Sequence, residues 1–430
     1  MQWFGVHRSY LALGLGVAVS GMCVASIAHA ENEAAPPVAA PLATATGVDF
    51  IAQAQSIYQL VACAKNRTVP ARFETAAVNA HCDKIDRLID GFRTGWLAKA
   101  ATFFGSIRPA TLPDTVVYPF AGGDLVSAIV TYPNASQYNA ISVETVGDPR
   151  AVDTVDGKAL ERTYMITEHN ITNQFKVAHS RTDNLARAER DALPAELIFA
   201  LIALRVYNLE PVRLNYFHVR ADGTLEYLTR EQLDAPQGQG DDNRFDSMEL
   251  AFRPEGSGPT GRVQIFRHFS ANLDNKHLAD SPGLLKYLET NGKVAAMTKA
   301  ASYLLWGDRF STIRNYLLAH MVWMPSDSTG IPPHFAVAAG FTQETYGTFE
   351  GPFLEDATKG PDVEFATLWR SQPHRDAPMA YGYPDMHHHY HILITTPAEP
   401  ATATTTGSAV APVPGGTAQG PFGQSPPVEP

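Results

Sequence analysis

Hydrophobic residues recur along the chain with two different periods, and these periods define the elements that we predict. Two early segments repeat apolar residues at helical spacing, from Phe50 to Val61 and from Val78 to Trp96. Cys63 follows the first segment and Cys82 lies on the apolar stripe of the second. A helical period also predicts helices further on, at 152–178, 197–205, 284–288 and 310–321. The pattern of apolar residues is less regular at 152–178 than in the other three segments.

Alternation of apolar and polar residues predicts short strands and hairpins in the rest of the chain. The alternating segments lie at 115–120, 138–146, 212–218, 225–227, 248–252 and 263–265. Asp222-Gly223 offers a tight turn for a first antiparallel hairpin, and 255–261 is the turn of a second one. The part from 335 to 396 holds short strands and several Gly/Pro turns. Since helices and strands do not alternate regularly, the sequence predicts an α+β fold rather than a doubly wound parallel sheet.

The two ends of the chain differ in composition from this body. Arg8, an apolar stretch at 11–27 and Ala28-His29-Ala30 are typical of a secretory signal peptide, although an uncleaved membrane anchor would have the same pattern. We therefore predict a signal peptide at 1–30, a flexible leader at 31–47, an α+β body at 48–396 (one large domain or two tightly packed ones) and a disordered Pro/Thr/Ala-rich tail at 397–430. No second apolar stretch is long enough to span a bilayer, so we expect no transmembrane helix in the mature chain.

The charge balance excludes one class of partner and leaves others open. The formal net charge is -11, and loss of Arg8 with the signal peptide would make it about -12. An acidic surface repels phosphate backbones, so nucleic acid is not an expected partner. We expect an envelope partner or a small ligand instead.

Cysteine usage agrees with export. Three cysteines are present, and the two beyond the signal segment are Cys63 and Cys82. In an oxidising compartment such a pair predicts one disulfide, which would join the first two helices into a pinned hairpin. A redox-active pair is the alternative, but redox pairs are usually closer in sequence, as in Cys-x-x-Cys.

The densest group of titratable residues is Asp385-Met386-His387-His388-His389-Tyr390-His391. If Met386 to Ile394 is extended, His387, His389 and His391 lie on one face, where imidazoles could share a divalent metal such as zinc. An exposed histidine-rich turn with weak affinity is the alternative interpretation. No His-Glu-x-x-His element occurs, and no cofactor is otherwise predicted.

Two turn-like segments could carry further chemistry. Ser326 to Pro332 could present a catalytic serine or an anion nest, but its residues are also those that build turns, and no Gly-x-Ser-x-Gly elbow is present. Ala121-Gly122-Gly123-Asp124 follows a predicted strand and could cradle an anion or, with Tyr118, line a pocket. It lacks the pattern of a P-loop or a dinucleotide fingerprint, so a plain turn is the simpler interpretation.

Two longer segments give a resemblance. They resemble segments of a family of uncharacterised exported bacterial proteins without assigned activity. The first is YPFAGGDLVSAIVTYPNASQYNAISVETVG at 118–147. The second is SYLLWGDRFSTIRNYLLAHMVWMPSDSTGIP at 302–332, with Tyr346-Gly347-Thr348 after it. In that family the second segment tends to read Asp-Ser-Gly-Ile-Pro, whereas here Thr329 interrupts it. The resemblance implies bacterial export and suggests one shared binding site, made of Gly122, Gly123, Asp124, Asp327 and Gly330. Tyr118, from the pocket interpretation of the Gly-Gly turn, completes the predicted set.

Together these patterns predict an exported bacterial envelope protein, periplasmic or secreted, with a binding or accessory role. The alternative is a secreted hydrolase, assisted by a metal at His387, His389 and His391, with a carboxylate such as Asp385 or Asp327.

Overall fold

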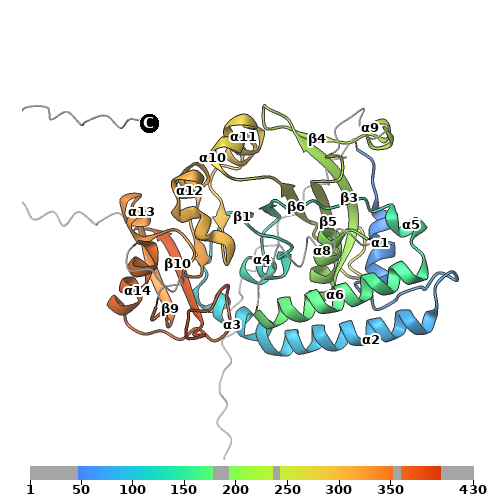
Figure 1. The fold of residues 1–430 in the computed structure, drawn as a ribbon, viewed down its shortest axis with the longest axis horizontal. Coiled ribbons are helices and arrows are strands. Elements are labelled where there is room, and N and C mark those ends of the chain that lie inside the picture. The colour runs from blue at the N-terminus through green and yellow to red at the C-terminus, as the bar shows by residue number, and fades with distance from the viewer. Residues whose placement is uncertain (1–46, 178–192, 236–242, 352–359, 399–430) are drawn as a thin grey trace, which may run out of the picture. The chain divides into compact units, whose positions relative to one another are not determined.

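The structure is a computed structural model that describes residues 47–177, 193–235, 243–351 and 360–398 (Figure 1). The predicted signal peptide lies outside these residues, as do nearly all of the predicted leader and tail. The described residues all belong to the larger of two compact units of the chain, which begins at Pro41.

In the described part of the chain, ten strands form a seven-stranded sheet, in the order β4-β3-β5-β6-β2-β1-β7, and a three-stranded sheet, in the order β8-β10-β9. The strands are β1 (Thr115–Pro119), β2 (Gln137–Ser142), β3 (Leu209–Val219), β4 (Leu225–Tyr227), β5 (Met248–Pro254), β6 (Gln264–Ser270), β7 (Ala295–Ala296), β8 (Met324–Ser326), β9 (Phe341–Gly347) and β10 (His391–Pro397). The pairs β1–β2, β1–β7 and β2–β6 are parallel, and the other pairs are antiparallel.

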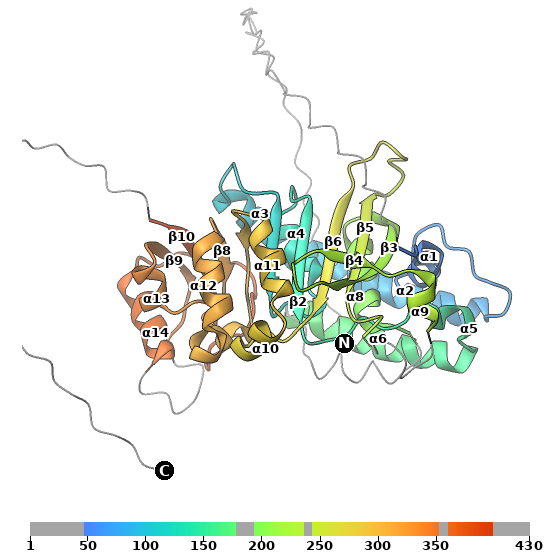
Figure 2. The ribbon, with the colours of Figure 1, turned by 90° about the horizontal axis from the view of Figure 1, so that it is seen from above.

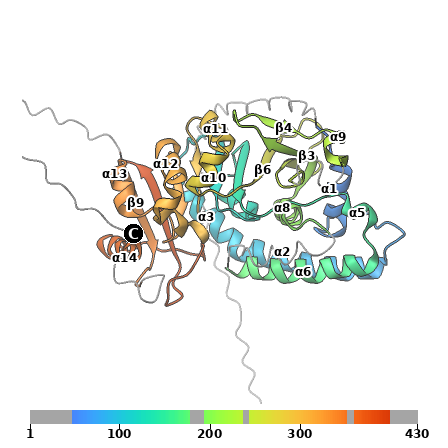
Figure 3. The ribbon, with the colours of Figure 1, turned by 45° about the horizontal axis from the view of Figure 1, so that its top comes forward.

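Helices surround these strands. The α-helices are α1 (Ile51–Leu60), α2 (Thr75–Phe92), α3 (Ala98–Ile107), α4 (Leu125–Thr131), α5 (Ala151–Thr154), α6 (Gly157–Val177), α8 (Ala195–Val206), α9 (Arg230–Asp234), α10 (Asn275–Asp280), α11 (Gly283–Thr290), α12 (Ser311–His320), α13 (Pro333–Ala338) and α14 (Pro361–Ser371). A π-helical segment at Arg93–Leu97 joins α2 to α3, and 3₁₀ turns lie at Ala301–Trp306 and Asp308–Phe310. The helices α2 and α6 run side by side (Figure 3).

The predicted α+β fold is confirmed, including both antiparallel hairpins. The first hairpin pairs β3 with β4 and the second pairs β5 with β6. The parallel pairing of β1, β2, β6 and β7 was not predicted. Strands β1 and β7 are separated by more than 170 residues of chain, and β7 has only two residues, so its sequence carries no alternation that could reveal it.

Backbone hydrogen bonds link the two sheets where the chain at β7 runs beside the chain at β8. The N–H groups of Ala296 and Thr298 donate to the carbonyls of Trp323 (3.1 Å) and Pro325 (3.2 Å), in a parallel arrangement. Strands β1, β2, β6, β7 and β8 therefore end at one edge of the sheet, which we call the carboxyl edge. Because β10 is antiparallel to β8, it begins at this edge.

Each face of the seven-stranded sheet has its own hydrophobic core. Helices lie against the sheet on both sides (Figure 2). Alternate residues of β1 divide between them: Tyr118 packs in the first core and Val117 in the second. Residues of α1, α2, α3, α4 and α8 complete the first core, and residues of α10, α11 and α12 complete the second. The helices that follow β1 and β7 in the chain thus lie on opposite faces of the sheet.

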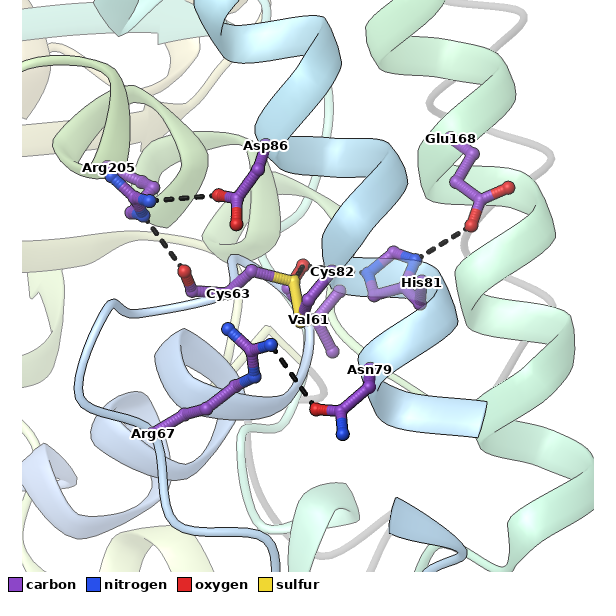
Figure 4. The surroundings of a disulfide bond; sticks show 9 residues. All are labelled: Val61, Cys63, Arg67, Asn79, His81, Cys82, Asp86, Glu168 and Arg205. Carbon is purple, nitrogen blue, oxygen red and sulfur yellow. Dashed lines mark hydrogen bonds and ion pairs between the residues drawn. A yellow bond between two sulfur atoms is a disulfide. The ribbon is translucent and has the colours of Figure 1, made fainter. Parts of the chain in front are cut away.

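The predicted disulfide is present and joins the end of α1 to α2 (Figure 4). The Cα atoms of Cys63 and Cys82 lie 5.3 Å apart, and both residues are fully buried. The carbonyl of Cys63 accepts a hydrogen bond from Arg205 Nε (2.8 Å). The guanidinium of Arg205 also pairs with Asp86 of α2 (2.9 Å), so that the bridge is tied to α8 as well. The environment is that of a structural bridge.

Candidate functional site

The carboxyl edge gathers most of the residues that the sequence marks as chemically interesting. Gly122-Gly123-Asp124 follows β1, Asp327 follows β8, and His391 begins β10. In open α/β sheets, ligands bind outside the carboxyl ends of the strands, where the chain leaves neighbouring strands toward opposite faces. Here that point lies between β1 and β7, since α4 follows β1 on one face and α12 follows β7 on the other.

A buried charged pair occupies this point. Lys299, three residues after β7, places Nζ 2.8 Å from Oδ2 of Asp124, and both residues are only 2% exposed. Tyr118 donates its hydroxyl to the same oxygen (2.9 Å). Ser127 donates Oγ–H to Oδ1 of Asp124 (2.9 Å) and accepts a hydrogen bond from Lys299 Nζ (2.7 Å). The predicted pair of Tyr118 and Asp124 is thus brought together, with a lysine that the sequence did not reveal.

Two aromatic rings cover Lys299. Its Nζ lies 5.1 Å from the ring centre of Tyr381 and 5.9 Å from that of Trp96, which is within cation–π range. Trp96 belongs to the π-helical segment, a feature that is frequent at functional sites, and its Nε1 donates to the carbonyl of Ala380 (2.6 Å). Burial, with Asp124 as the next cause, raises the pKa of both Tyr118 and Tyr381 far above the ordinary value of 10, so both phenols stay protonated.

Asp327 is attached to this centre through the backbone. Its Oδ2 accepts hydrogen bonds from the N–H groups of Ala300 (2.9 Å) and Tyr383 (2.8 Å), and its Oδ1 accepts from the N–H and hydroxyl of Thr329 (2.9 and 2.5 Å). Ala300 has a φ of +61°, a backbone conformation that residues other than glycine rarely adopt. Consecutive residues, Lys299 and Ala300, therefore hold Asp124 and Asp327 together.

The predicted glycines serve close packing. A Cβ on Gly123 would lie 2.9 Å from Cβ of Phe199 and 3.2 Å from a carboxylate oxygen of Glu196. A turn that faces a carboxylate is unsuited to an anion, so the anion-cradle interpretation does not fit this geometry. At Gly330, a Cβ would collide with the side chain of Ser326. The predicted set of candidate residues is thus gathered at one edge, where Gly123 and Gly330 pack closely against neighbouring side chains.

The histidine cluster differs from its predicted conformation. The segment expected to be extended contains a turn at Met386 and His387, and β10 begins only at His391. His389 Nδ1 lies 3.0 Å from Oδ2 of Asp385, while His391 turns inward and its Nε2 lies 2.9 Å from Oγ of Ser328. The strand face that would have aligned His387, His389 and His391 is therefore absent. Within the described ranges, no group of three His, Cys, Asp or Glu side chains could hold a metal ion.

The contact between Ser328 and His391 is a serine–histidine pair that the sequence could not reveal, because 63 positions separate the residues. Both are buried, at 0% and 1% exposure. Burial lowers the pKa of His391, despite the opposing effect of Asp327, so the imidazole is neutral at pH 7. A neutral imidazole at this distance can accept the serine proton.

An open cleft of about 640 Å³ lies further along the carboxyl edge, where β3 and β6 end and β5 begins. Its volume is typical of small-molecule sites. The turn after β3, the segment 243–247 and the helices α10 and α11 form its walls. The polar residues that line it are His218, Asn243, Asp246, Ser247, Ser270, Asn272, His277, Asp280 and Ser281. None of these residues stands out in the sequence as part of a site, because turns and helix ends from three distant segments contribute them.

Comparison with known proteins supplies no further assignment: no family, no curated protein and no solved structure matches the chain. Among the residues that the structure describes, no helix is long and apolar enough to cross a membrane.

Proposed function

We propose that the protein is an exported bacterial envelope protein, periplasmic or secreted, which binds a small molecule and has no chemistry of its own. The open cleft at the carboxyl ends of β3 and β6 is the observation that carries this proposal. The buried disulfide and the signal-like first thirty residues support export. The resemblance to uncharacterised exported bacterial proteins supports the same compartment.

The cleft suits a ligand better than the buried centre does. Lys299, Asp124 and Ser127 already satisfy one another and are packed against Trp96 and Tyr381. We assign this centre the role of fixing the carboxyl edge, on which the walls of the cleft depend.

A variant that fills the cleft tests the proposal. Ser281 lines the cleft and is exposed, so Ser281→Trp places an indole in it without disturbing either core. Ser371→Trp is the matched control, at an exposed position at the end of α14. Calorimetric titration of the full chain with spermidine, glucose and citrate should give saturable binding of at least one probe, lost in Ser281→Trp and kept in Ser371→Trp. Saturable binding that survives in Ser281→Trp would contradict a site in the cleft.

A hydrolase is the second candidate, and the pairing of Ser328 with His391 favours it. In this mechanism Ser328 Oγ attacks an ester carbonyl while His391 Nε2 takes its proton, the proton passes to the leaving alcohol, and water then releases the acid. Because both residues are buried, the surrounding chain must open for a substrate to enter. The metal-assisted form would need His387, His389 and His391 to rearrange.

Hydrolysis of p-nitrophenyl acetate tests this candidate. Ser328→Ala should abolish turnover, whereas Ser326→Ala removes a neighbouring buried hydroxyl that has no hydrogen-bond partner and should leave it unchanged. Equal rates in both variants would contradict a role for Ser328. Zinc analysis of protein purified without a metal column, before and after His389→Ala, tests the metal-assisted form.

A further inference from the structure

We infer that the ligand of the cleft is an aliphatic amine, with its ammonium groups at the carboxylates of the cleft and its methylenes on the apolar floor. This inference rests on the proposed function and names the chemical class of its ligand.

The ionisable groups of the cleft favour a cation. Two carboxylates, Asp246 and Asp280, line it; each already interacts with another group of the chain, and none of the described lining residues is a lysine or arginine. The Lys276 ammonium pairs with Asp280 at 2.5 Å, but both side chains are mostly exposed, and such a pair is weak enough for a ligand ammonium to replace it.

A third carboxylate adds to the negative potential behind the wall of the cleft. Asp274 accepts a hydrogen bond from the N–H of His277 (2.9 Å) and lies 2.8 Å from its Nδ1. These two bonds, the backbone one first, lower the pKa of Asp274 to about 2, so it is charged at neutral pH. Arg309, at 3.4 Å from Asp274 Oδ2, is highly exposed and screens this charge only in part.

The floor of the cleft is apolar and suits methylene groups. Phe217, Phe269, Leu278 and Leu284 belong to the second core and line the cleft from below. The rings of Phe217 and Phe269 pack edge to face, with centroids 5.2 Å apart, which makes this floor rigid. Apolar walls with a few well-placed polar groups are characteristic of small-molecule sites.

The net charge of the whole chain also favours a cationic ligand. With a formal net charge of -11, the protein attracts cations and repels anions over the range of the Debye length. The same charge would also attract amines without a site, so the test must separate the two kinds of binding.

Titration with spermidine, glucose and citrate, at low and at physiological salt, makes this separation. We expect one spermidine per chain at both salt concentrations, with an affinity at least tenfold lower in Asp246→Asn and lost in Ser281→Trp. Asp376→Asn removes an exposed carboxylate outside the cleft, and Ser371→Trp adds an exposed indole; both should bind as the parent does.

The possible failures are distinguishable. Binding of glucose or citrate that Ser281→Trp abolishes, without a spermidine site, would overturn the amine assignment and leave the proposed function standing. Spermidine binding of equal affinity in Ser281→Trp and Asp246→Asn would show attraction by net charge alone and would overturn the inference.

Discussion

Lys299 Nζ lies 2.8 Å from Oδ2 of Asp124, and this buried pair links the chain after β7 to the chain after β1. The residue that follows, Ala300, donates its N–H to Asp327 after β8. Three neighbouring strand ends therefore meet through one lysine and its backbone neighbour. Buried ion pairs contribute little net stability, but loss of one partner is costly because the other charge stays buried.

We accordingly expect Lys299→Met to lower the free energy of unfolding by about 3 to 5 kcal/mol, because Asp124 is left without its counter-charge. The double variant with Asp124→Asn should recover part of this loss. Urea unfolding followed by tryptophan fluorescence measures both. Lys276→Met, at an exposed ion pair, is the control and should leave the free energy of unfolding nearly unchanged. A cost equally small for Lys299→Met would show that the pair does not hold the strand ends.

The sequence predicted local structure well and long-range pairing poorly. The apolar stripe that contains Cys82 and the alternation at 212–218 each depend on a local period, and both predicted elements are present. The pairing of β1 with β7 involves only two residues of β7, both alanine, and the contact of Ser328 with His391 depends on packing. Neither leaves a periodic signal in the chain.

The residues of the candidate site show the same difference between local patterns and long-range contacts. Tyr118 and Asp124 are six positions apart, and the predicted turn between them is the reason that the sequence grouped them in one candidate site, although it did not predict their hydrogen bond. Lys299 was missed because nothing near it in the chain marks it as buried. His387 and His389 were expected on a strand because alternation cannot distinguish a strand from the turn that precedes it.

Gly382, in the segment after α14, packs closely against the side chain of Asp327. It has a φ of +73°, and a Cβ there would collide with the Asp327 carboxylate. We expect Gly382→Ala to destabilise the protein by more than the roughly 1 kcal/mol that a positive φ alone costs. Gly340→Ala is the matched control, since Gly340 has a φ of +78° with open space around it. Equal melting temperatures for the two variants would contradict the close approach.

The disulfide should contribute measurably to stability. Cys63 and Cys82 are 19 positions apart, and closing a loop of this length lowers the entropy of the unfolded chain by an amount equivalent to about 3 kcal/mol. We expect the double variant Cys63→Ala, Cys82→Ala to lose roughly that amount in urea unfolding. Addition of a reductant should destabilise the parent protein and leave the double variant unaffected. Parent stability that is equal with and without the bridge would contradict a structural role.

Three buried histidines predict how stability depends on pH. Burial lowers the pKa of His81, His268 and His391 in the folded protein, whereas the unfolded chain takes up protons near pH 6.5. Their contribution to stability is therefore complete above pH 6.5 and is lost as the pH falls below this value toward the folded pKa values. Each histidine adds a slope of up to about 1.4 kcal/mol per pH unit.

His268 is the clearest case, because it is fully buried on β6 with Nε2 2.9 Å from the carbonyl of Glu144. That nitrogen must donate, since a carbonyl only accepts, so further protonation falls on Nδ1. Nδ1 is buried and makes no hydrogen bond; Oε2 of the buried Glu196 lies 3.7 Å away and would offset only part of the cost of charging the ring, since burial is the largest effect on its pKa. His268→Gln should reduce the slope of unfolding free energy between pH 6.5 and 5, a window above the ordinary range of carboxylates. The exposed His374→Gln should leave it unchanged. Stability that stays constant over this window in the parent protein would show that these histidines do not resist protonation.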